Sequence, residues 1–529
     1  MMFSPKLKFL PLALVTTLGL SACGGSSSDI SGNNNNNGNN NGSNEFEWVA
    51  GQFTPYRDLA QECSSTNGIA EKLWMRSWSN DTYLWYDEII DRDPANFSIE
   101  DYFNVLITNE LSESGNRKDN FHFSMPTDEW QQLNQSGASF GYGMNYSLRN
   151  ASATTSRQVT VTFTDPSTPA ATANVSRGAV LVEIDGVNVA SAATQAEIDI
   201  LNAGLFPTDN GKQTEFVVRD LGSSQLRTVN LTAQTVIATP VQNTKTIQTT
   251  SGKVGYLQFN THIATAERGL YDAFTTLANE GVDDLVIDLR YNGGGLLAIA
   301  SQMGYMVAGE QATTGKTFEQ MRFNDKYPNS DPVTGATLEP TPFIPISLGY
   351  NEDLLGRGVA LPSLNLDRVF VLTTDSTCSA SEAFMNGLRG IDIEVIQIGD
   401  TTCGKPYGFY PTDNCDTTYF TIQFRGENQK GFGDYSDGFM PSMNPVISSQ
   451  VQGCVVEDDL NHALGDSSEG LLSAALHYRA NGSCPAVAQS KALAAPAVPF
   501  DDPGYMLEDT RKQSLWRNNR ILTDINGAQ

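Results

Sequence analysis

The pattern of apolar and polar positions after residue 250 switches between two periods. Short apolar runs at 254–259, 285–289, 369–373 and 393–398 predict strands, and stretches with helical spacing cover 265–279, 296–307 and 380–388. The run at 285–289 is mostly apolar, which suits the interior of a parallel sheet. Strands that alternate with helices predict βαβ units, so we expect an α/β core over residues 236–485.

Residues 136–235 have the pattern of a β-rich domain. Strand-like runs occur at 159–163, 179–184, 216–219 and 226–231, with one helical stretch at 193–203. Residues 46–133 are helix-compatible, and we interpret their spaced tryptophans, Trp74, Trp78 and Trp85, as core residues. The predicted fold class is α/β and multidomain, with a helical N-terminal cap, a β-rich domain and an α/β core.

The first 45 residues have no pattern of a folded domain. Residues 1–22 join a positively charged start to a short apolar stretch and end in Leu20-Ser21-Ala22, before Cys23. This resembles a bacterial lipoprotein signal, which implies a lipid on Cys23 and, with Gly24 next, sorting to the outer membrane of the cell envelope. An ordinary signal peptide with a chance cysteine is the alternative. Residues 23–45 are mostly Gly, Ser and Asn, which predicts a flexible tether.

Composition narrows the classes of partner. The chain has 529 residues, and 33 Lys and Arg against 60 Asp and Glu give a formal charge of −27. This acidity argues against nucleic acid and against electrostatic attachment to anionic lipid. The six cysteines after Cys23 allow up to three disulfides in 15 pairings. No CxxC or Cys/His cluster is present, so we expect neither a metal site nor a cofactor.

Three segments of the predicted core carry groups that suit acyl transfer. Gly293-Gly294-Gly295 follows a strand, and its backbone amides can approach a developing anion. Ser379 begins a predicted helix, where unpaired amides favour an alkoxide, although Ser379 and Glu382 also fit a capping box. Lys405 has no charged neighbour within four positions, and a desolvated lysine can be neutral at pH 7. Taken singly, each segment also has an ordinary structural interpretation.

Together the segments resemble the C-terminal processing peptidases, also called tail-specific proteases. Three motifs occur in the family's order: Arg290-Tyr291-Asn292-Gly293-Gly294-Gly295, Ser379-Ala380-Ser381-Glu382 and Gly404-Lys405. The lysine follows the serine by 26 positions, as 405 − 379 = 26. The strand before Asp185-Gly186 is similar to the central part of a PDZ domain. Phe140, Gly141, Tyr142 and Gly143 match the loop that receives a peptide carboxylate. The resemblance covers about residues 136–450.

The resemblance implies a role for each matching residue. Ser379 is expected to be the nucleophile and Lys405 its general base. Amides of Ala380 and of Gly293 or Gly294 are expected to form the oxyanion hole, and Glu382 to support the site. Two positions depart from the family pattern, because Pro406 follows the lysine and Phe409 stands where several members have an orienting Gln.

The predicted function is a lipid-anchored serine endopeptidase that cleaves exported polypeptides, with a PDZ-like domain that engages substrate tails. A catalytically silent peptide-binding scaffold of the same fold is the alternative. A Ser-His-Asp site at His262, which follows a strand, is the rival catalytic arrangement. Cys378 and Cys403 flank the catalytic positions, and a disulfide between them would brace the site, although each can pair elsewhere. Residues 486–529 are predicted to be an irregular tail, and the sequence predicts no oligomeric state.

Overall fold

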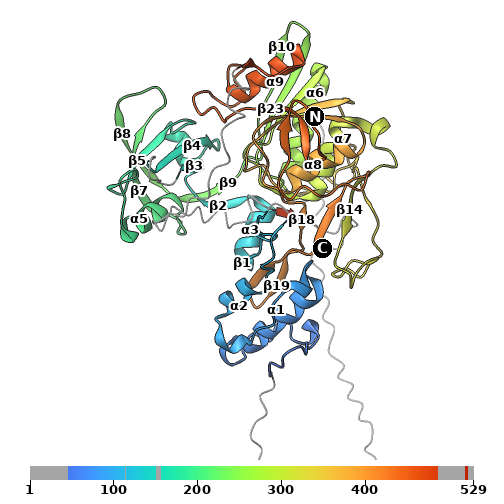
Figure 1. Cartoon of the computed structure of the whole chain (residues 1–529). Helices are drawn as coiled ribbons and strands as arrows, with labels where there is room; N and C mark the ends of the chain where they lie inside the picture. The colour runs from blue at the N-terminus through green and yellow to red at the C-terminus, as the bar shows by residue number, and fades with distance from the viewer. Residues whose placement is uncertain (1–45, 113–114, 150–155, 487–518, 522–529) are drawn as a thin grey trace, which may run out of the picture. The chain divides into compact units, whose positions relative to one another are not determined.

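The structure is a computed structural model that describes residues 46–112, 115–149, 156–486 and 519–521 (Figure 1). The predicted signal, Cys23, the tether and most of the predicted tail lie outside these residues. Within the described ranges, no helix combines the length and the apolar character needed to cross a membrane.

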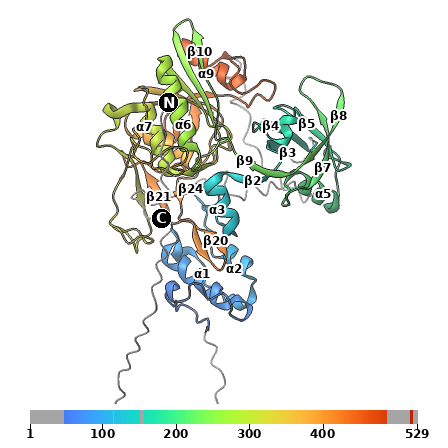
Figure 2. The ribbon, with the colours of Figure 1, turned by 180° about the vertical axis from the view of Figure 1, so that it is seen from behind.

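A seven-stranded sheet forms the α/β core (Figure 2). Its strand order is β10-β11-β12-β16-β17-β23-β22, and all neighbours are parallel except β10 and β11. Every residue of β12 is buried, as expected for a central parallel strand. The strands are β10 (Val241–Thr249), β11 (Gly252–Phe259), β12 (Asp284–Asp288), β16 (Arg368–Thr373), β17 (Glu394–Gly399), β22 (Met440–Ser442) and β23 (Gln450–Val455).

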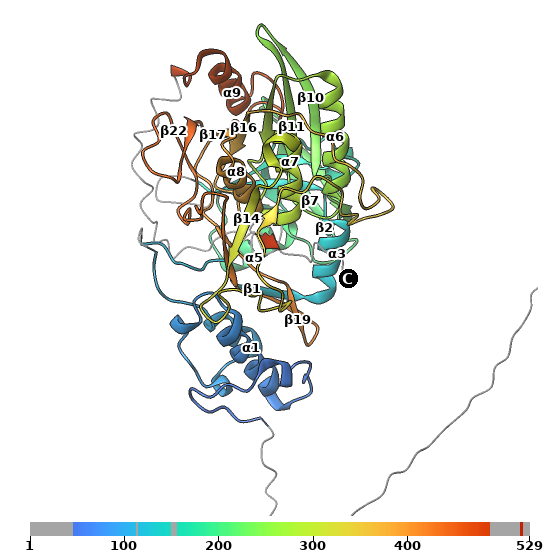
Figure 3. The same ribbon diagram turned by 90° about the vertical axis from the view of Figure 1, so that its right-hand side faces the viewer.

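Helices cover both faces of this sheet (Figure 3). On one face, α6 (Ala266–Glu280), α7 (Leu297–Thr313) and α8 (Ala380–Gly390) share an apolar cluster with Leu257 of β11. On the other face, α9 (Gly470–Asn481) packs in a second cluster with Tyr256, the residue before Leu257. Adjacent residues of β11 thus pack in two different apolar clusters, because successive side chains of a strand point to opposite faces of the sheet.

The predicted βαβ core is confirmed. The predicted elements 285–289, 265–279 and 380–388 correspond to β12, α6 and α8, each within two residues at either end. The pattern did not predict β10, which has few apolar positions and a break in register after Gln242. The predicted fold class, with its PDZ-like domain, is confirmed as well.

The PDZ-like domain has its own apolar cluster, separate from that of the core. Its main sheet has the order β3-β4-β5-β7-β8, and every pair is antiparallel. Its elements are β3 (Met144–Arg149), β4 (Gln158–Thr164), α4 (Pro169–Thr172), β5 (Val180–Ile184), β6 (Val187–Asn188), α5 (Gln195–Leu205), β7 (Gln213–Arg219) and β8 (Leu226–Thr232). A short ladder of β2 (Ala138–Gly141) and β9 (Gln234–Ile237) lies where the chain enters and leaves this domain.

The N-terminal region packs against a late segment of the chain. Trp74 and Trp78 of α1 (Ile69–Thr82) are buried and stacked with ring centroids 5.2 Å apart, so both are core residues as predicted. Strand β1 (Phe123–Pro126) pairs with β20 (Thr417–Phe420), which also pairs with β19 (Thr412–Asn414). The region's other helices are α2 (Ile99–Val105) and α3 (Thr127–Ser136).

Two smaller ladders lie close to the predicted site. One joins β14 (Thr317–Arg322), β15 (Thr341–Pro342), β18 (Tyr407–Gly408) and β21 (Phe424–Glu427). The other is a parallel pair of β13 (Gly294–Leu296) and β24 (Asn519–Ile521). The six cysteines form three disulfides, Cys63–Cys415, Cys378–Cys403 and Cys454–Cys484.

Candidate active site

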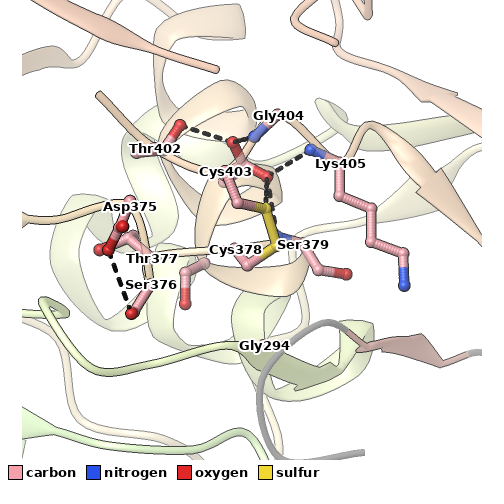
Figure 4. Close-up of a disulfide and its surroundings, with 12 residues drawn as sticks. Gly294, Asp375, Ser376, Thr377, Cys378, Ser379, Thr402, Cys403, Gly404 and Lys405 are labelled. Carbon is pink, nitrogen blue, oxygen red and sulfur yellow. Dashed lines mark hydrogen bonds between the residues drawn. A yellow bond between two sulfur atoms is a disulfide. The ribbon is translucent and has the colours of Figure 1, made fainter. Parts of the chain in front are cut away.

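Ser379 lies at the turn between β16 and α8 (Figure 4). It is the N-cap residue of α8, with φ 59° and ψ −109°. A non-glycine residue held in such a region costs about 1–3 kcal/mol, and strain of this kind is concentrated at functional sites. The side chain is fully buried, and Oγ makes no hydrogen bond within the part of the chain that the structure describes. The turn therefore holds an unpaired hydroxyl at the positive end of a helix.

Glu382 connects the serine turn to the lysine loop. Its carboxylate accepts hydrogen bonds from the amides of Ser379 and Lys405, both at 2.8 Å and both on Oε2. Its Oε1 accepts from Thr402 Oγ1 at 2.5 Å and from the Gly404 amide at 2.9 Å. Burial raises the pKa of Glu382, and these hydrogen bonds oppose that rise. One buried carboxylate thus holds both predicted catalytic segments, which agrees with the predicted supporting role.

The disulfide between Cys378 and Cys403 makes a second, covalent connection. Each cysteine lies within two residues of a predicted catalytic residue, and the bridge is visible beside Ser379 in Figure 4. This is the pairing that the sequence analysis considered as a brace for the site. The two segments are therefore joined twice, by the hydrogen bonds to Glu382 and by the disulfide.

Lys405 lies in an aromatic pocket. Its side chain is fully buried, and Nζ lies 4.7 Å from the ring centroid of Phe121 and 4.5 Å from that of Phe409. Burial lowers the pKa of Lys405 to about 7, while the carboxylates of Asp119 and Glu382 raise it. The lysine is thus neutral in a substantial fraction at neutral pH, as a general base requires.

Asp119 and Phe121 are functional candidates that the sequence analysis missed. Asp119 is buried, and its two carboxylate oxygens accept hydrogen bonds from Tyr83 Oη at 2.9 Å and from the Phe121 amide at 2.8 Å. The N-terminal region therefore contributes a carboxylate and a ring to the surroundings of Lys405. No local motif marks either residue, because their proximity to Lys405 arises only from the tertiary fold.

Asn292 organises the glycine turn. Its carbonyl accepts hydrogen bonds from the Cys378 amide at 3.1 Å and from Ser381 Oγ at 3.0 Å, so the turn contacts the serine segment directly. Its side-chain Oδ1 accepts from the Gly294 amide at 3.0 Å. Since the Gly294 amide is already engaged, Gly293 is the better of the two predicted oxyanion donors in this turn. Ala380 supplies the first amide of α8, which has no partner inside the helix.

His262 does not form the rival Ser-His-Asp arrangement. Its Nδ1 lies 3.0 Å from Asn292 Oδ1, and Ser379 Oγ has no hydrogen-bond partner among the described residues. Burial lowers the pKa of His262 to about 4, so the ring is neutral at physiological pH. The histidine supports the glycine turn through Asn292.

The predicted peptide loop lines a groove of about 290 Å³ in the PDZ-like domain. All four predicted residues, Phe140, Gly141, Tyr142 and Gly143, are among its walls, and the end of α5 forms another part. Phe140 is 43% exposed, whereas Tyr142 is buried and donates from Oη to Thr214 Oγ1 at 2.8 Å. The core residues Asn260, Thr261 and Tyr291 complete the wall, so the groove adjoins the segment that leads into the glycine turn.

Arg177 links the PDZ-like domain to the same segment of the core. Its guanidinium donates to Asp458 Oδ1 at 2.6 Å, to Tyr291 Oη at 2.5 Å and to the His462 carbonyl at 3.0 Å. Asp458 also accepts from the buried Arg290 at 2.8 Å. Two buried arginines, Arg177 and Arg290, therefore share the partly exposed Asp458 and connect the PDZ-like domain to the residues that precede Asn292.

Comparison with known proteins agrees with this geometry. The model of peptidase family S41 matches residues 253–415, which include Ser379 and Lys405. A carboxyl-terminal-processing protease of Picosynechococcus is 25% identical over 173 residues, which cover 33% of this chain and 40% of that protein. A chloroplastic C-terminal processing peptidase of Tetradesmus obliquus is 29% identical over 161 residues, which cover 28% of this chain and 34% of that protein.

A solved structure described as an S41 protease from Bacteroides fragilis matches with a TM-score of 0.58 at 21% identity. The match covers 78% of this chain and 97% of that one, and it shows a shared fold. The predicted resemblance to the C-terminal processing peptidases is therefore confirmed. The chain spans less than half the length of either curated relative.

Proposed function

We propose that this chain is a serine endopeptidase that cleaves exported polypeptides through an acyl-enzyme on Ser379, with Lys405 as general base. The observation that carries the proposal is the joint position of these residues. A strained serine at a helix start and a buried lysine with a pKa of about 7 are held by one carboxylate, that of Glu382.

The mechanism follows from the two groups. Neutral Lys405 takes the Ser379 proton as Oγ bonds to the carbonyl carbon of a peptide, and amides of Ala380 and Gly293 stabilise the oxyanion. The carbon–nitrogen bond then breaks while Lys405 gives the proton to the leaving amine. Water, deprotonated by the same lysine, cleaves the resulting ester and regenerates Ser379. The hydroxyl must rotate toward Nζ for the first step, since such hydrogen bonds often tighten only when substrate is bound.

We propose further that the PDZ-like groove binds substrate tails and that a lipid on Cys23 holds the enzyme at the outer membrane. The groove is lined by the four loop residues that resemble a carboxylate-binding loop. The names of the curated relatives, both C-terminal processing enzymes, support a polypeptide substrate with an accessible carboxyl end. The sequence around Cys23 supports the anchor.

Incubation of the full chain with a denatured protein tests the proposed activity. Wild type is expected to cleave it, whereas Ser379→Ala and Lys405→Ala are each expected to reduce cleavage by a factor of about 10³ or more. Exposed Ser224→Ala serves as the matched serine control and should retain full activity. Equal cleavage by wild type and Ser379→Ala would refute the nucleophile.

The second candidate function is a peptide-binding scaffold without activity. Two observations favour it: Phe409 occupies the position of the Gln that orients the base, and Ser379 Oγ has no hydrogen bond among the described residues. A wild type that binds denatured substrate but cleaves none of it, at neutral and mildly alkaline pH, would establish the scaffold instead.

A further inference from the structure

Strand β24 lies against all three elements that build the proposed active site. It pairs in parallel with β13, which contains the last two glycines of the turn (Figure 2). It also contacts α8, which begins directly after Ser379, and β18, which begins two residues after Lys405.

The two edges of β13 have different partners. The His262 amide donates to the Gly294 carbonyl at 2.9 Å, and the Leu296 amide donates to the His262 carbonyl at 2.8 Å. Backbone groups of successive strand residues point to opposite edges. Gly295 therefore directs its N–H and C=O away from His262, toward β24. The register Gly295↔Arg520 places the Asn519 carbonyl and the Ile521 amide opposite these two groups.

The edge that faces β24 is fixed in position. Gly295 has φ 131°, and a Cβ at this residue would lie 2.3 Å from the His262 carbonyl oxygen. Only glycine allows β13 to pack this closely on His262. The opposite edge is thus held rigidly and presents the N–H and the C=O of Gly295, which pair with no other described residue of the core. An extended polypeptide can pair with such an edge through its backbone alone.

We propose that β24 occupies the position that the strand of a polypeptide substrate takes, so that the chain's C-terminal segment competes with substrate for the active site. The inference rests on the proposed function of Ser379. Ser379 and Lys405 are both fully buried, so the site is closed to a second polypeptide in this structure. Because backbone pairing does not depend on side chains, a substrate strand can replace β24 on the same edge.

A tethered competitor has a defined kinetic effect. Its effective concentration is about 1 mM for a flexible link, so a strand with a dissociation constant of about 0.1–1 mM occupies about half to nine-tenths of the sites. Substrate must displace it, which raises the apparent KM by a factor of about 2 to 10 and leaves kcat unchanged, because the bound complex is the same.

Two truncations of the full chain test the kinetic effect. Removal of residues 519–529 deletes β24, whereas removal of residues 524–529 retains it and serves as the control. The first truncation is expected to lower KM for a denatured protein about 2- to 10-fold at constant kcat, and the second to match wild type. An active first truncation with the KM of wild type would overturn the inference.

A pair of proline substitutions tests the same pairing without shortening the chain. Ile521→Pro removes the amide assigned to the Gly295 carbonyl, whereas the amide lost in Arg520→Pro points away from β13. KM is therefore expected to fall further in Ile521→Pro than in Arg520→Pro. A fall of KM in Arg520→Pro alone would contradict the assigned register.

A binding measurement separates this inference from the proposed function. A fluorescent peptide with the sequence of residues 515–525 is titrated into Ser379→Ala chains that contain or lack residues 519–529. Binding at least twofold tighter to the chain that lacks β24 is expected, whether or not wild type cleaves any protein. Equal affinity for both chains would overturn the inference, and failure of wild type to cleave would overturn only the proposed activity.

Discussion

The proposed chemistry depends on the protonation state of a single residue, Lys405. Burial is the main cause of its pKa of about 7, and only the neutral amine can accept the Ser379 proton. We therefore predict that kcat/KM rises about tenfold per pH unit below pH 7 and levels off above it. A pH series of initial rates with a denatured protein measures this rise, which is the acidic limb of the pH–rate profile. A constant rate from about pH 5 to pH 9 would exclude Lys405 as the base.

The charge of Asp119 is expected to influence the pH at which this acidic limb lies. Its negative charge stabilises protonated Lys405 and so raises the lysine's pKa. Asp119→Asn removes the charge and keeps one oxygen, which can accept from the Phe121 amide, while its NH2 group replaces the oxygen that accepts from Tyr83 Oη. The acidic limb is therefore expected to move to lower pH, by about 0.5–1 unit. Asp128→Asn makes the same change at an exposed position and should leave the limb in place. A limb that moves to higher pH in Asp119→Asn would contradict the argument.

The sequence could indicate some residues of the site and not others, for a physical reason. Ser379, Lys405 and the glycine turn stand in local phrases, and the structure places those phrases around Glu382. Asp119 reaches the site only because β1 pairs with β20, which brings the N-terminal region beside the lysine loop. Such a contact depends on long-range pairing, which leaves no local signal.

At the scale of elements, the sequence predicts best those strands and helices whose apolar residues recur at a regular spacing. Strands β11, β12, β16 and β17 and helices α6 and α8 could be placed within two residues, whereas α7 ends at Thr313 rather than at 307. Strand β10 could not be predicted, since its polar residues resemble a loop. Strand β24 has three residues and a partner more than 200 positions earlier, so no periodicity marks it. Short strands are defined by their partners rather than by their own sequence.

The disulfide that joins the serine and lysine segments leads to an element-scale prediction. Cys378–Cys403 and Cys454–Cys484 close loops of similar length, with separations of 25 and 30 residues. Loop-closure entropy predicts that loss of either bridge lowers the free energy of unfolding by about 3–4 kcal/mol. Only Cys378→Ala/Cys403→Ala is expected to lower kcat as well, about tenfold, because it loosens the geometry of the site.

Cys454→Ala/Cys484→Ala is the matched control for this prediction. Urea unfolding and steady-state rates are measured for both double variants under the same oxidising conditions. Equal kcat values in the two variants would show that Cys378–Cys403 stabilises the fold without positioning the catalytic groups.

At the scale of the whole chain, Arg177 is one of the residues through which the PDZ-like domain contacts the core. It is buried and donates to Asp458, to Tyr291 and to backbone carbonyls of the core. Beside it, Gly178 has φ 82°, and a Cβ there would lie 2.4 Å from the Leu460 carbonyl oxygen, so the backbones meet closely. Tyr291 lies in the groove wall and directly before Asn292. The contact thus joins the proposed tail-binding groove to the glycine turn.

Arg177→Ala should therefore loosen the contact between the domains and weaken catalysis together. Arg177→Ala removes a charge-assisted hydrogen bond to Asp458, which is worth about 1.5–3 kcal/mol, while Asp458 keeps its ion pair with Arg290. We expect amide hydrogen exchange at residues 177–181 and 458–462 to accelerate about 100-fold, with a lower kcat on denatured substrate. Arg268→Ala, which removes an exposed pair with Asp272, is the control and should change neither value. Faster exchange in Arg177→Ala with an unchanged kcat would mean that the contact holds the domain in place without influencing the glycine turn.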